Sequence, residues 1–432
     1  MFAYYLDLAL RSLMRNKALT ALMVLAIALG IGASMTTLTV LHVLSGDPMP
    51  GKSQTLFYPQ LDPQDMNGYR PEDEPPDQLT WIDGMNLLHA KRADHQALMT
   101  GGTVPVQPVQ SGIDAFYTDA RYTTADFFPM FDVPLLYGHA WTSAEDDGKA
   151  RVVVIARSLN DKLFAGRDST GQMLRLGDGA FRIIGVLDTW QPNPHFYDLN
   201  TGSFSSKEQV FLPLSTSRDL KLTRNGSNNC WKGHAEDEME TAACTWLQFW
   251  VQLDSPAKAT AYKEYLMHYA QEQHTLGRFE RPAKVRLRDL MDWLDYQKIV
   301  PGDVRLQTWL ALGFLLVCLV NTVGLMLAKF LRRAGELGVR RALGASKRAL
   351  FMQLLVESGV IGLSGGLFGL LLAFFGLWLV RQRPSSYAAL AHLDMSMLLT
   401  TFLLAIGASL IAGLLPAWRA CQITPAQQLK SN

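Results

Sequence analysis

Four long apolar runs without a single charged residue dominate the hydrophobic pattern of this chain. Each has at least about 20 residues, which is the length that a helix needs to cross the hydrocarbon core of a bilayer. Backbone polar groups in lipid must bond to one another, so each run is predicted to be a transmembrane helix. The complete lack of Asp, Glu, Lys and Arg argues against the alternative, four buried core helices of a large soluble protein. The runs are residues 18–46, 306–328, 358–380 and 395–418.

Lys and Arg gather on one side of these four spans. They precede the first span, fill residues 329–348 between the second and third, and follow the fourth. Basic residues mark cytoplasmic segments, so both termini are expected to be cytoplasmic and residues 47–305 to lie outside. The first run is roughly twice as long as the apolar part of a signal peptide, and no clear cleavage site follows it. We therefore expect it to remain as an anchor.

The large segment between the first two spans has a mixed pattern, which predicts an α+β domain. Short runs rich in β-branched residues and bounded by Gly, Pro and Asp predict strands, and longer runs with apolar residues on one face predict helices. The chain is thus expected to be an α-helical membrane protein with four transmembrane helices and a large α+β extracytoplasmic domain inserted between helices one and two. The predicted strands are 151–156, 181–187, 209–214 and 246–253, and the predicted helices are 158–165 and 256–276.

Two of the four cysteines, Cys230 and Cys244, fall in the extracytoplasmic segment. An oxidising compartment permits a disulfide between them, and we favour that pairing over two free buried thiols. The acidic stretch between them could suggest a metal site. Its spacing is irregular and no second histidine is near, so a solvated acidic loop is the better interpretation and no metal site is expected. The residues concerned are His234, Glu236, Asp237, Glu238 and Glu240.

The sequence GDPMPGKS, residues 46–53, fits the pattern of a phosphate-binding loop, with Gly46, Gly51, Lys52 and Ser53 at the defining positions. Such a loop offers consecutive backbone N–H groups and then begins a helix. Pro48 and Pro50 remove two of those donors, and the residues that follow have an extended pattern. The motif also lies on the side of the membrane without ATP. We interpret it as a chance match.

The other function classes that we considered find little support in the sequence. No nucleophile-elbow pattern marks a hydrolytic site among the outside residues, so a non-catalytic chain is expected. A net charge of +1 argues against a nucleic-acid binder. Small residues in the spans allow close helix contact, but the sequence leaves open whether that contact lies within one chain or in a dimer. They are Gly30, Gly32, Gly362, Gly366, Gly369 and Gly407.

The basic segment between the second and third spans predicts a short helix that projects into the cytoplasm. Glu336, Leu337 and Val339 begin an amphipathic piece, Gly344 interrupts it, and Ser346 is placed to cap the next helix. The alternative is a plain basic loop without further function.

Several stretches of the chain resemble the MacB/FtsX-type ABC transporter permeases. The sequence ELGVRRALGAS (336–346), followed by QLLVES (353–358) and GLSGGLFG (362–369), is similar to the signature of that family. Residues 8–33 resemble its amphipathic first helix and first span, and residues 415–430 its C-terminal end. Residues 120–142, with the strands after them, resemble the periplasmic core domain of MacB-like members. The resemblance covers nearly the whole chain, in the order of the predicted topology.

This resemblance implies the membrane subunit of an ABC complex in the bacterial inner membrane. The family pattern has two permease chains, identical or different, and a dimer of ATPase subunits that binds ATP and Mg. The chain itself is expected to bind no cofactor. Membrane lipid is expected to contact its spans. A periplasmic adaptor and an outer-membrane channel stay open as further partners. The docking helix for the ATPase is carried over onto Glu336, Leu337, Gly338, Val339, Arg340, Arg341, Ala342, Leu343 and Gly344.

Within the family, three functions remain in view. The size of the outside segment favours a MacB-like exporter or extractor. An FtsX-like regulator of cell-wall hydrolases and a lipoprotein-releasing permease are the alternatives. The expected organisation is an amphipathic cytoplasmic helix (1–17), first span (18–46), extracytoplasmic core domain (47–305), second span (306–328), cytoplasmic coupling segment (329–357), third span (358–380), short outside loop (381–394), fourth span (395–418) and cytoplasmic tail (419–432).

Overall fold

The computed structural model describes residues 2–108, 112–204, 208–233, 238–382, 393 and 395–422. The chain divides into two compact units. One consists of Met1–Ser45 together with Val300–Asn432, and the other of Gly46–Ile299. The second unit is therefore an insertion between the first two apolar helices, as the hydrophobic pattern predicts. The predicted outside loop (381–394) and tail (419–432) lie mostly beyond the described residues.

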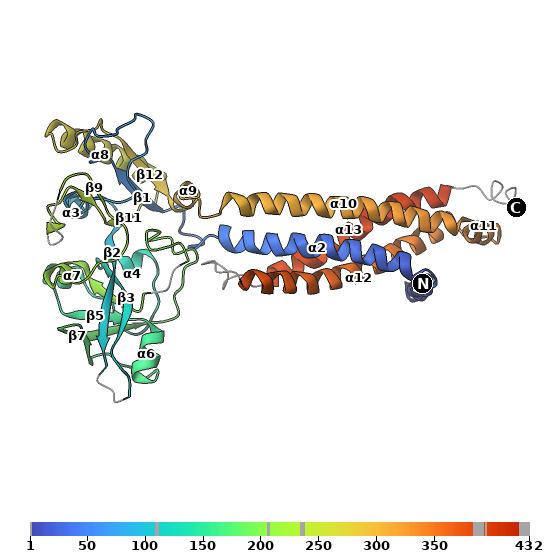
Figure 1. The fold of residues 1–432 in the computed structure, drawn as a ribbon, viewed down its shortest axis with the longest axis horizontal. Coiled ribbons are helices and arrows are strands. Elements are labelled where there is room, and N and C mark those ends of the chain that lie inside the picture. Colours follow the sequence, from blue (N-terminus) through green and yellow to red (C-terminus); the bar gives the residue numbers. More distant parts are fainter. Residues whose placement is uncertain are drawn as a thin grey trace. The chain divides into compact units, whose positions relative to one another are not determined.

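Four helices of the first unit are long and apolar enough to cross a membrane. Figure 1 shows them running side by side, and each contacts at least two of the others. The helices extend past the uncharged runs, because charged residues at their ends continue the helical hydrogen bonding. The four are α2 (Lys17–Ser45), α10 (Gly302–Arg332), α12 (Lys347–Arg381) and α13 (Met395–Gln422), and two shorter helices, α1 (Phe2–Arg15) and α11 (Ala334–Ala342), complete the unit.

Glycines of α12 bring this helix into close contact with two neighbours. A Cβ on Gly365 would lie 2.6 Å from Ile27 Cγ2 of α2, and one on Gly362 would overlap Ser409 of α13. Small residues at a helix interface let the backbones approach closely. These glycines therefore serve packing within one chain, which the sequence had left open. Gly30, Gly32, Gly366 and Gly369 have similar surroundings, whereas a Cβ on Gly407 would meet no atom within 4 Å.

The second unit is built on one mixed sheet of ten strands, with a separate two-stranded ribbon. The strand order is β12-β1-β11-β2-β3-β8-β5-β7-β4, and β6 pairs with β2 and β7. The pairs β3–β8 and β5–β7 are parallel and the other pairs are antiparallel. The strands are β1 (Leu56–Leu61), β2 (His95–Gln107), β3 (Phe116–Thr123), β4 (Leu135–Gly138), β5 (Val152–Ile155), β6 (Met173–Leu176), β7 (Gly179–Leu187), β8 (Val210–Pro213), β9 (Asn229–Cys230), β10 (Cys244–Thr245), β11 (Gln248–Gln252) and β12 (Val285–Asp289).

Both faces of this sheet are buried, which explains why strands such as β5 and β8 are apolar without alternation. Along β5, Val153 and Ile155 belong to one hydrophobic cluster, whereas Val152 and Val154 belong to another. Figure 1 shows α8 beside β12 at one end of the sheet and α6 beside β5 and β7 at the other. The helices are α3 (Trp81–Ala90), α4 (Phe127–Met130), α5 (Ser143–Asp147), α6 (Arg157–Phe164), α7 (Leu214–Asp219), α8 (Pro256–Thr275) and α9 (Leu290–Tyr296).

The predicted elements of this unit are present in the structure. Strands β5, β7, β8 and β11 lie inside or largely over the predicted runs, and α6 and α8 correspond to the predicted helices. In α8, Tyr262, Leu266 and Tyr269 are buried on the face that the pattern indicates. The long hairpin of β2 and β3 had no counterpart among the predictions.

Candidate coupling site

The segment between α10 and α12 folds as a short helix, α11, followed by a sharp break. Gly344 has a φ of +101°, a conformation that side chains other than glycine rarely adopt, so the helix ends here. The Ser346 side chain then accepts a hydrogen bond from the backbone N–H of Ala349 at 3.2 Å, which caps α12. The predicted break and cap are both present. From this cap, α12 begins at Lys347 and continues without interruption into the apolar run, as expected.

The nine residues proposed for docking have two kinds of surroundings. Leu337 is 6% exposed and packs into the hydrophobic cluster of the helical unit. Val339 and Leu343 are 57% and 83% exposed, respectively. An isolated exposed Leu is common, but these two lie within a turn of each other on α11 and its C-terminal end. The outer side of α11 thus presents apolar side chains, while its inner side holds the helix against the bundle.

Glu336 and Arg340 fasten α11 to its neighbours through charge. Arg340 Nη2 lies 2.9 Å from Glu336 Oε1, and its Nη1 donates to Gln353 Oε1 of α12 at 3.3 Å. Arg15 of α1 approaches Glu336 at 3.5 Å. Burial tends to raise the pKa of Glu336, but Arg333, Arg340 and Arg15 outweigh it and hold that pKa below its usual value. Glu336 is therefore ionised, and its carboxylate lies among three arginines.

A buried ionic cluster lies behind α11. Glu357 of α12 is fully buried, and its Oε1 is 2.7 Å from Nζ of the equally buried Lys329 of α10. The other carboxylate oxygen accepts from Arg333 Nη1 at 3.1 Å, and Ser12 Oγ of α1 donates to Oε1 at 2.6 Å. We call Ser12, Lys329, Arg333 and Glu357 the Glu357 cluster. One carboxylate thus joins three helices of the unit.

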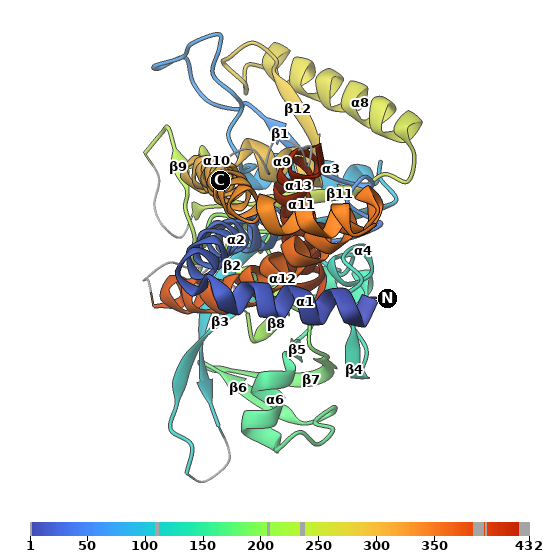
Figure 2. The same cartoon turned by 90° about the vertical axis from the view of Figure 1, so that its right-hand side faces the viewer.

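Arg333 connects this cluster to α11. Its guanidinium contacts Glu357 and Ser12 on one side and Glu336 on the other, where Nε lies 3.4 Å from Oε2. Figure 2 shows α1 and α11 together at one end of the helical unit, with α12 running away behind them. These charged contacts therefore link α11 to α1, α10 and α12, so a displacement of α11 would also displace groups on those three helices.

The sequence indicated this cluster only weakly. In the sequence, Glu357 is one of two acidic residues in the basic segment 329–357, and Lys329 directly follows the second apolar run. Their pairing depends on how α10 packs against α12, which no local pattern reports. The available signal was a lone acidic residue next to an uncharged run, because an ionised group in such a place needs a partner.

The stretch that resembles a phosphate-binding loop has other roles in the structure. Lys52 Nζ lies 2.6 Å from Asp132 Oδ1, and Ser53 Oγ donates to Asp47 Oδ2 at 2.5 Å. Residues 49–55 form turns that lead into strand β1 rather than a helix. The backbone N–H of Ser53 donates to the carbonyl of Met49. This geometry differs from that of a phosphate cradle, where the glycine loop opens a helix.

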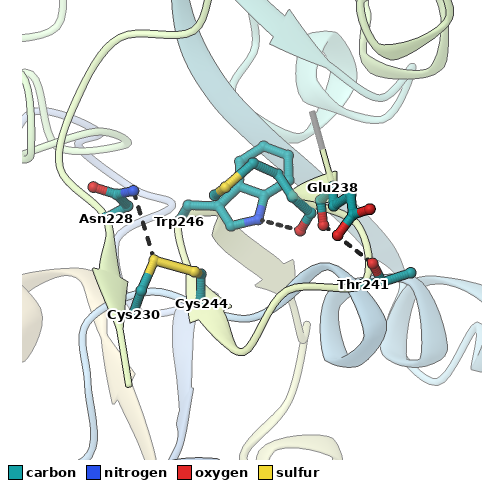
Figure 3. Close-up of a disulfide and its surroundings, with 7 residues drawn as sticks. Asn228, Cys230, Glu238, Thr241, Cys244 and Trp246 are labelled. Atoms are coloured by element: carbon teal, nitrogen blue, oxygen red, sulfur yellow. Dashed lines mark hydrogen bonds between the residues drawn. A yellow bond between two sulfur atoms is a disulfide. The ribbon is translucent and has the colours of Figure 1, made fainter. Parts of the chain in front are cut away.

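Cys230 and Cys244 are joined by a disulfide that links β9 to β10. Figure 3 shows Trp246 beside it, with Nε1 donating to the carbonyl oxygen of Met239 at 3.2 Å. Of the acidic stretch between the cysteines, His234, Glu236 and Asp237 lie outside the described residues. Glu238 is exposed, as expected for a solvated loop, and Glu240 is partly exposed, with its carboxylate 2.6 Å from Arg218 Nε.

The described part of the chain combines four helices long and apolar enough to cross a membrane, a short charged helix between two of them and an inserted α+β domain, an arrangement that suits a membrane permease. The family profile described as MacB-like periplasmic core domain matches residues 20–269, and the one described as FtsX-like permease C-terminal matches residues 309–425. The chain belongs to the MacB/FtsX-type ABC transporter permeases, and it is a membrane protein with a MacB-like periplasmic domain. Both the resemblance inferred from the sequence and the fold class are thereby confirmed.

Individual relatives are distant. The chain is 23% identical to the pyoverdine export ATP-binding/permease protein PvdT of Pseudomonas entomophila, over 99% of this chain and 59% of that protein. It is also 23% identical to the macrolide export ATP-binding/permease protein MacB of Syntrophobacter fumaroxidans, over 71% of this chain and 46% of that protein. The crystal structure of the periplasmic region of MacB from Actinobacillus actinomycetemcomitans matches with a TM-score of 0.38 and 15% identity, covering 59% of this chain and 97% of that one. The chain spans about three fifths of the length of PvdT.

Proposed function

We propose that this chain is the permease of an ATP-driven export or extraction complex of the MacB type. In this proposal an ABC ATPase dimer binds ATP and Mg and docks on α11 from the cytoplasm. The chain itself performs no hydrolysis. It transmits the motion of the ATPase through its helices to the periplasmic domain, which acts on a drug, peptide, toxin or lipid-linked substrate. The observation that carries the proposal is the connection of α11 to the Glu357 cluster.

The surface of α11 supports the docking part of this proposal. A helix that presents exposed Val339 and Leu343 beside basic residues suits a groove on a partner protein. Its inner side is held by buried Leu337 and by the Glu336 ion pairs, so the helix can move with the bundle rather than slide on it. The names of the relatives, which combine ATP-binding and permease functions, agree with an ATPase partner.

The proposed topology follows from the charge pattern. Both termini and α11 lie in the cytoplasm of a bacterium, the four helices cross the inner membrane, and the unit Gly46–Ile299 is periplasmic. A second permease chain completes the complex, and an adaptor with an outer-membrane channel would complete an export path. An FtsX-like regulator would use the same coupling, and the match of residues 309–425 to the FtsX-like permease description is the observation that keeps this second function in view.

The docking proposal can be tested by adding charge to the outer side of α11. Leu343→Asp places a carboxylate at its most exposed apolar position, whereas Leu276→Asp makes the same change at a 70% exposed residue of the other unit. We expect Leu343→Asp to reduce the amount of ATPase that co-purifies with the tagged chain by about tenfold or more, as for an interface hot spot. Leu276→Asp should leave it unchanged.

Two results would contradict the proposal. A wild-type chain that brings down no ATPase from its native membrane would remove the partner altogether. Equal recovery of ATPase with both variants would exclude α11 as its docking site. Thermal unfolding of each purified variant, compared with wild type, would separate a lost contact from a misfolded chain.

A further inference from the structure

The periplasmic unit contains a cavity of about 760 Å³ that the proposed coupling does not use. It lies between α3 and the start of β2 on one side and α5 and α7 on the other. Thr124, Ala125 and Asp126 also line it. Its volume falls within the range of sites that hold small organic molecules.

One wall of this cavity is apolar and partly aromatic. Trp81, Met85 and Leu88 of α3 line it, together with Leu214 of α7. The Trp81 ring is held by stacking on the buried ring of Trp246, with 5.9 Å between centroids and 6° between planes. A fixed indole beside flexible Met and Leu side chains suits a flat apolar group, because it offers contact area at little cost in conformational entropy.

The remaining lining is acidic. It includes six carboxylates but only three Lys or Arg side chains. Three of the carboxylates have basic partners: Asp94 pairs with Lys258, Asp219 with Lys149 at 3.0 Å, and Glu240 with Arg218 at 2.6 Å. The other three are Asp126, Asp146 and Asp147.

These three carboxylates lack a Lys or Arg partner in the described part of the chain. Asp126 has only the ring of His95, at 3.5 Å, and a hydrogen bond from the Gln96 backbone N–H. Asp146 accepts hydrogen bonds from the backbone N–H of Ala125 at 2.6 Å and from Trp141 at 3.0 Å. Lys91 is the one lining cation without an ion pair among the described residues, so Asp126 and Asp147 leave the cavity with an excess of negative charge.

A buried acceptor in the same wall also lacks a partner. Gln96 lines the cavity and is 5% exposed, and its Nε2 donates to the carbonyl oxygen of Leu88 at 3.0 Å. Its Oε1 is buried and accepts no hydrogen bond within the described residues. A buried polar atom of this kind costs free energy unless a donor reaches it. A ligand that carries an N–H or O–H group would supply that donor once the Gln96 side chain turns its Oε1 toward the cavity.

We propose that this cavity binds a small organic cation with a flat apolar part. The apolar part lies against Trp81, Met85 and Leu88, and the positive group lies toward Asp126 and Asp147. The inference goes beyond the proposed function and does not depend on it, because the site is formed within the periplasmic unit alone. Binding can therefore be measured without an ATPase.

The test uses two probes of the same ring and opposite charge. The full chain is placed in lipid nanodiscs and titrated calorimetrically with 1-naphthylmethylammonium, whose charged group also carries N–H donors, and with 1-naphthylmethanesulfonate, and empty nanodiscs give the background. We expect the ammonium probe to bind to the wild-type chain and the sulfonate to bind at least about fivefold more weakly, as expected for one charge contact near a surface.

Substitutions in the lining test whether the ammonium probe binds in this cavity. Asp126→Asn and Asp147→Asn each remove one negative charge from the lining, and each should weaken binding of the ammonium probe by up to about fivefold. The matched control is Asp178→Asn, which removes a charge from an exposed turn of the same unit. It should leave the affinity unchanged.

The proposal is overturned if the wild-type chain binds neither probe above background, or if both probes bind equally. It is also overturned if the Asp126 and Asp147 variants, folded as judged by their unfolding temperature, bind as well as the Asp178 variant. A failed coupling test with α11 would leave all these results unaffected, so the two proposals can fail separately.

Discussion

At the scale of single residues, Glu357 has the most demanding position in the helical unit. Its carboxylate is fully buried and neutralises Lys329. It also accepts hydrogen bonds from Arg333 and Ser12. Taking a pair of charges out of water is costly, and their mutual attraction offsets that cost only when the geometry is good. The intact pair therefore adds little net stability to the fold. Removing one of its two members, however, leaves a buried charge without a counter-charge, which is strongly destabilising.

We predict that Glu357→Gln destabilises the chain by about 3–5 kcal/mol, because Lys329 then stays buried without its counter-charge. Adding Lys329→Met should recover much of the loss. Thermal unfolding in detergent, arranged as a double-mutant cycle, measures the coupling. The exposed pair of Asp7 and Arg11 is the control, and Asp7→Asn should cost less than about 1 kcal/mol. Equal effects at Glu357 and Asp7 would contradict the buried pairing.

Asp146 gives a pH dependence with a defined sign. Burial raises its pKa to about 7, against the hydrogen bonds from Ala125 and Trp141, while Asp147 and Asp126 raise it further. Its folded pKa thus lies above the ordinary value of about 3.9 in the unfolded chain. The stability due to this proton is fully present below pH 4 and is lost as pH rises toward 7.

We therefore predict that the unfolding free energy of the wild-type chain falls between pH 4 and 7, and that it falls less in Asp146→Asn. The absolute stability of the variant will also change, since an amide replaces a hydrogen-bond acceptor, so the informative quantity is the slope with pH. Urea unfolding followed by tryptophan fluorescence at pH 4.5, 6 and 7.5 measures it. Slopes that are identical in wild type and variant would show that Asp146 does not titrate in this range.

At the scale of elements, the glycines of α12 decide how closely the helices pack. Gly365 faces Ile27 of α2, whose β-branched side chain has little rotational freedom. We predict that Gly365→Ala destabilises the helical unit by about 1–3 kcal/mol through overpacking. Gly407→Ala, in open surroundings on α13, should be neutral or slightly stabilising, because Ala has the higher helix propensity. The unfolding temperatures of the two variants are measured in detergent. Equal shifts for Gly365→Ala and Gly407→Ala would contradict the packing role of Gly365.

The elements also show how far the sequence could be interpreted. The strands β5, β7, β8 and β11 were predictable because each is a short apolar run with turn residues around it. Strand β2 was not, because Gly101, Gly102 and Pro105 interrupt its pattern. In the structure the Tyr122 ring of the paired strand covers Gly102, where a side chain would clash. The glycines that weaken the strand signal are required by a contact that only the fold creates.

The candidate site was predictable to a similar extent. The break at Gly344 and the cap at Ser346 follow from local chemistry, so α11 could be placed from the sequence. The Glu357 cluster could not, since Ser12 and Glu357 lie 345 positions apart and meet only when α1 packs on α12. The same holds for the cavity of the periplasmic unit, whose walls come from α3, α5 and α7.

At the scale of the whole molecule, the proposed function requires α11 and the inserted domain to be on opposite sides of the membrane. The charge pattern predicts this, because the basic residues that flank the spans lie on the side of α11. Two segments lie on opposite sides of a membrane when an odd number of spans separates them. One candidate span, α10, lies between the inserted domain, which ends at Ile299, and α11, which begins at Ala334. The exposed residues Leu343 and Tyr117 make this geometry accessible to chemistry.

We predict that cysteines at these two positions react from opposite sides. In a background carrying Cys318→Ala and Cys421→Ala, with the Cys230–Cys244 disulfide retained, Tyr117→Cys should be labelled by a membrane-impermeant maleimide in intact spheroplasts. Leu343→Cys should be labelled only after the membrane is permeabilised. Each site is its own control, because permeabilisation must not increase labelling at 117. If Leu343→Cys reacts in intact spheroplasts as fast as Tyr117→Cys, then no cytoplasmic ATPase can dock on α11, whatever the contacts of the Glu357 cluster.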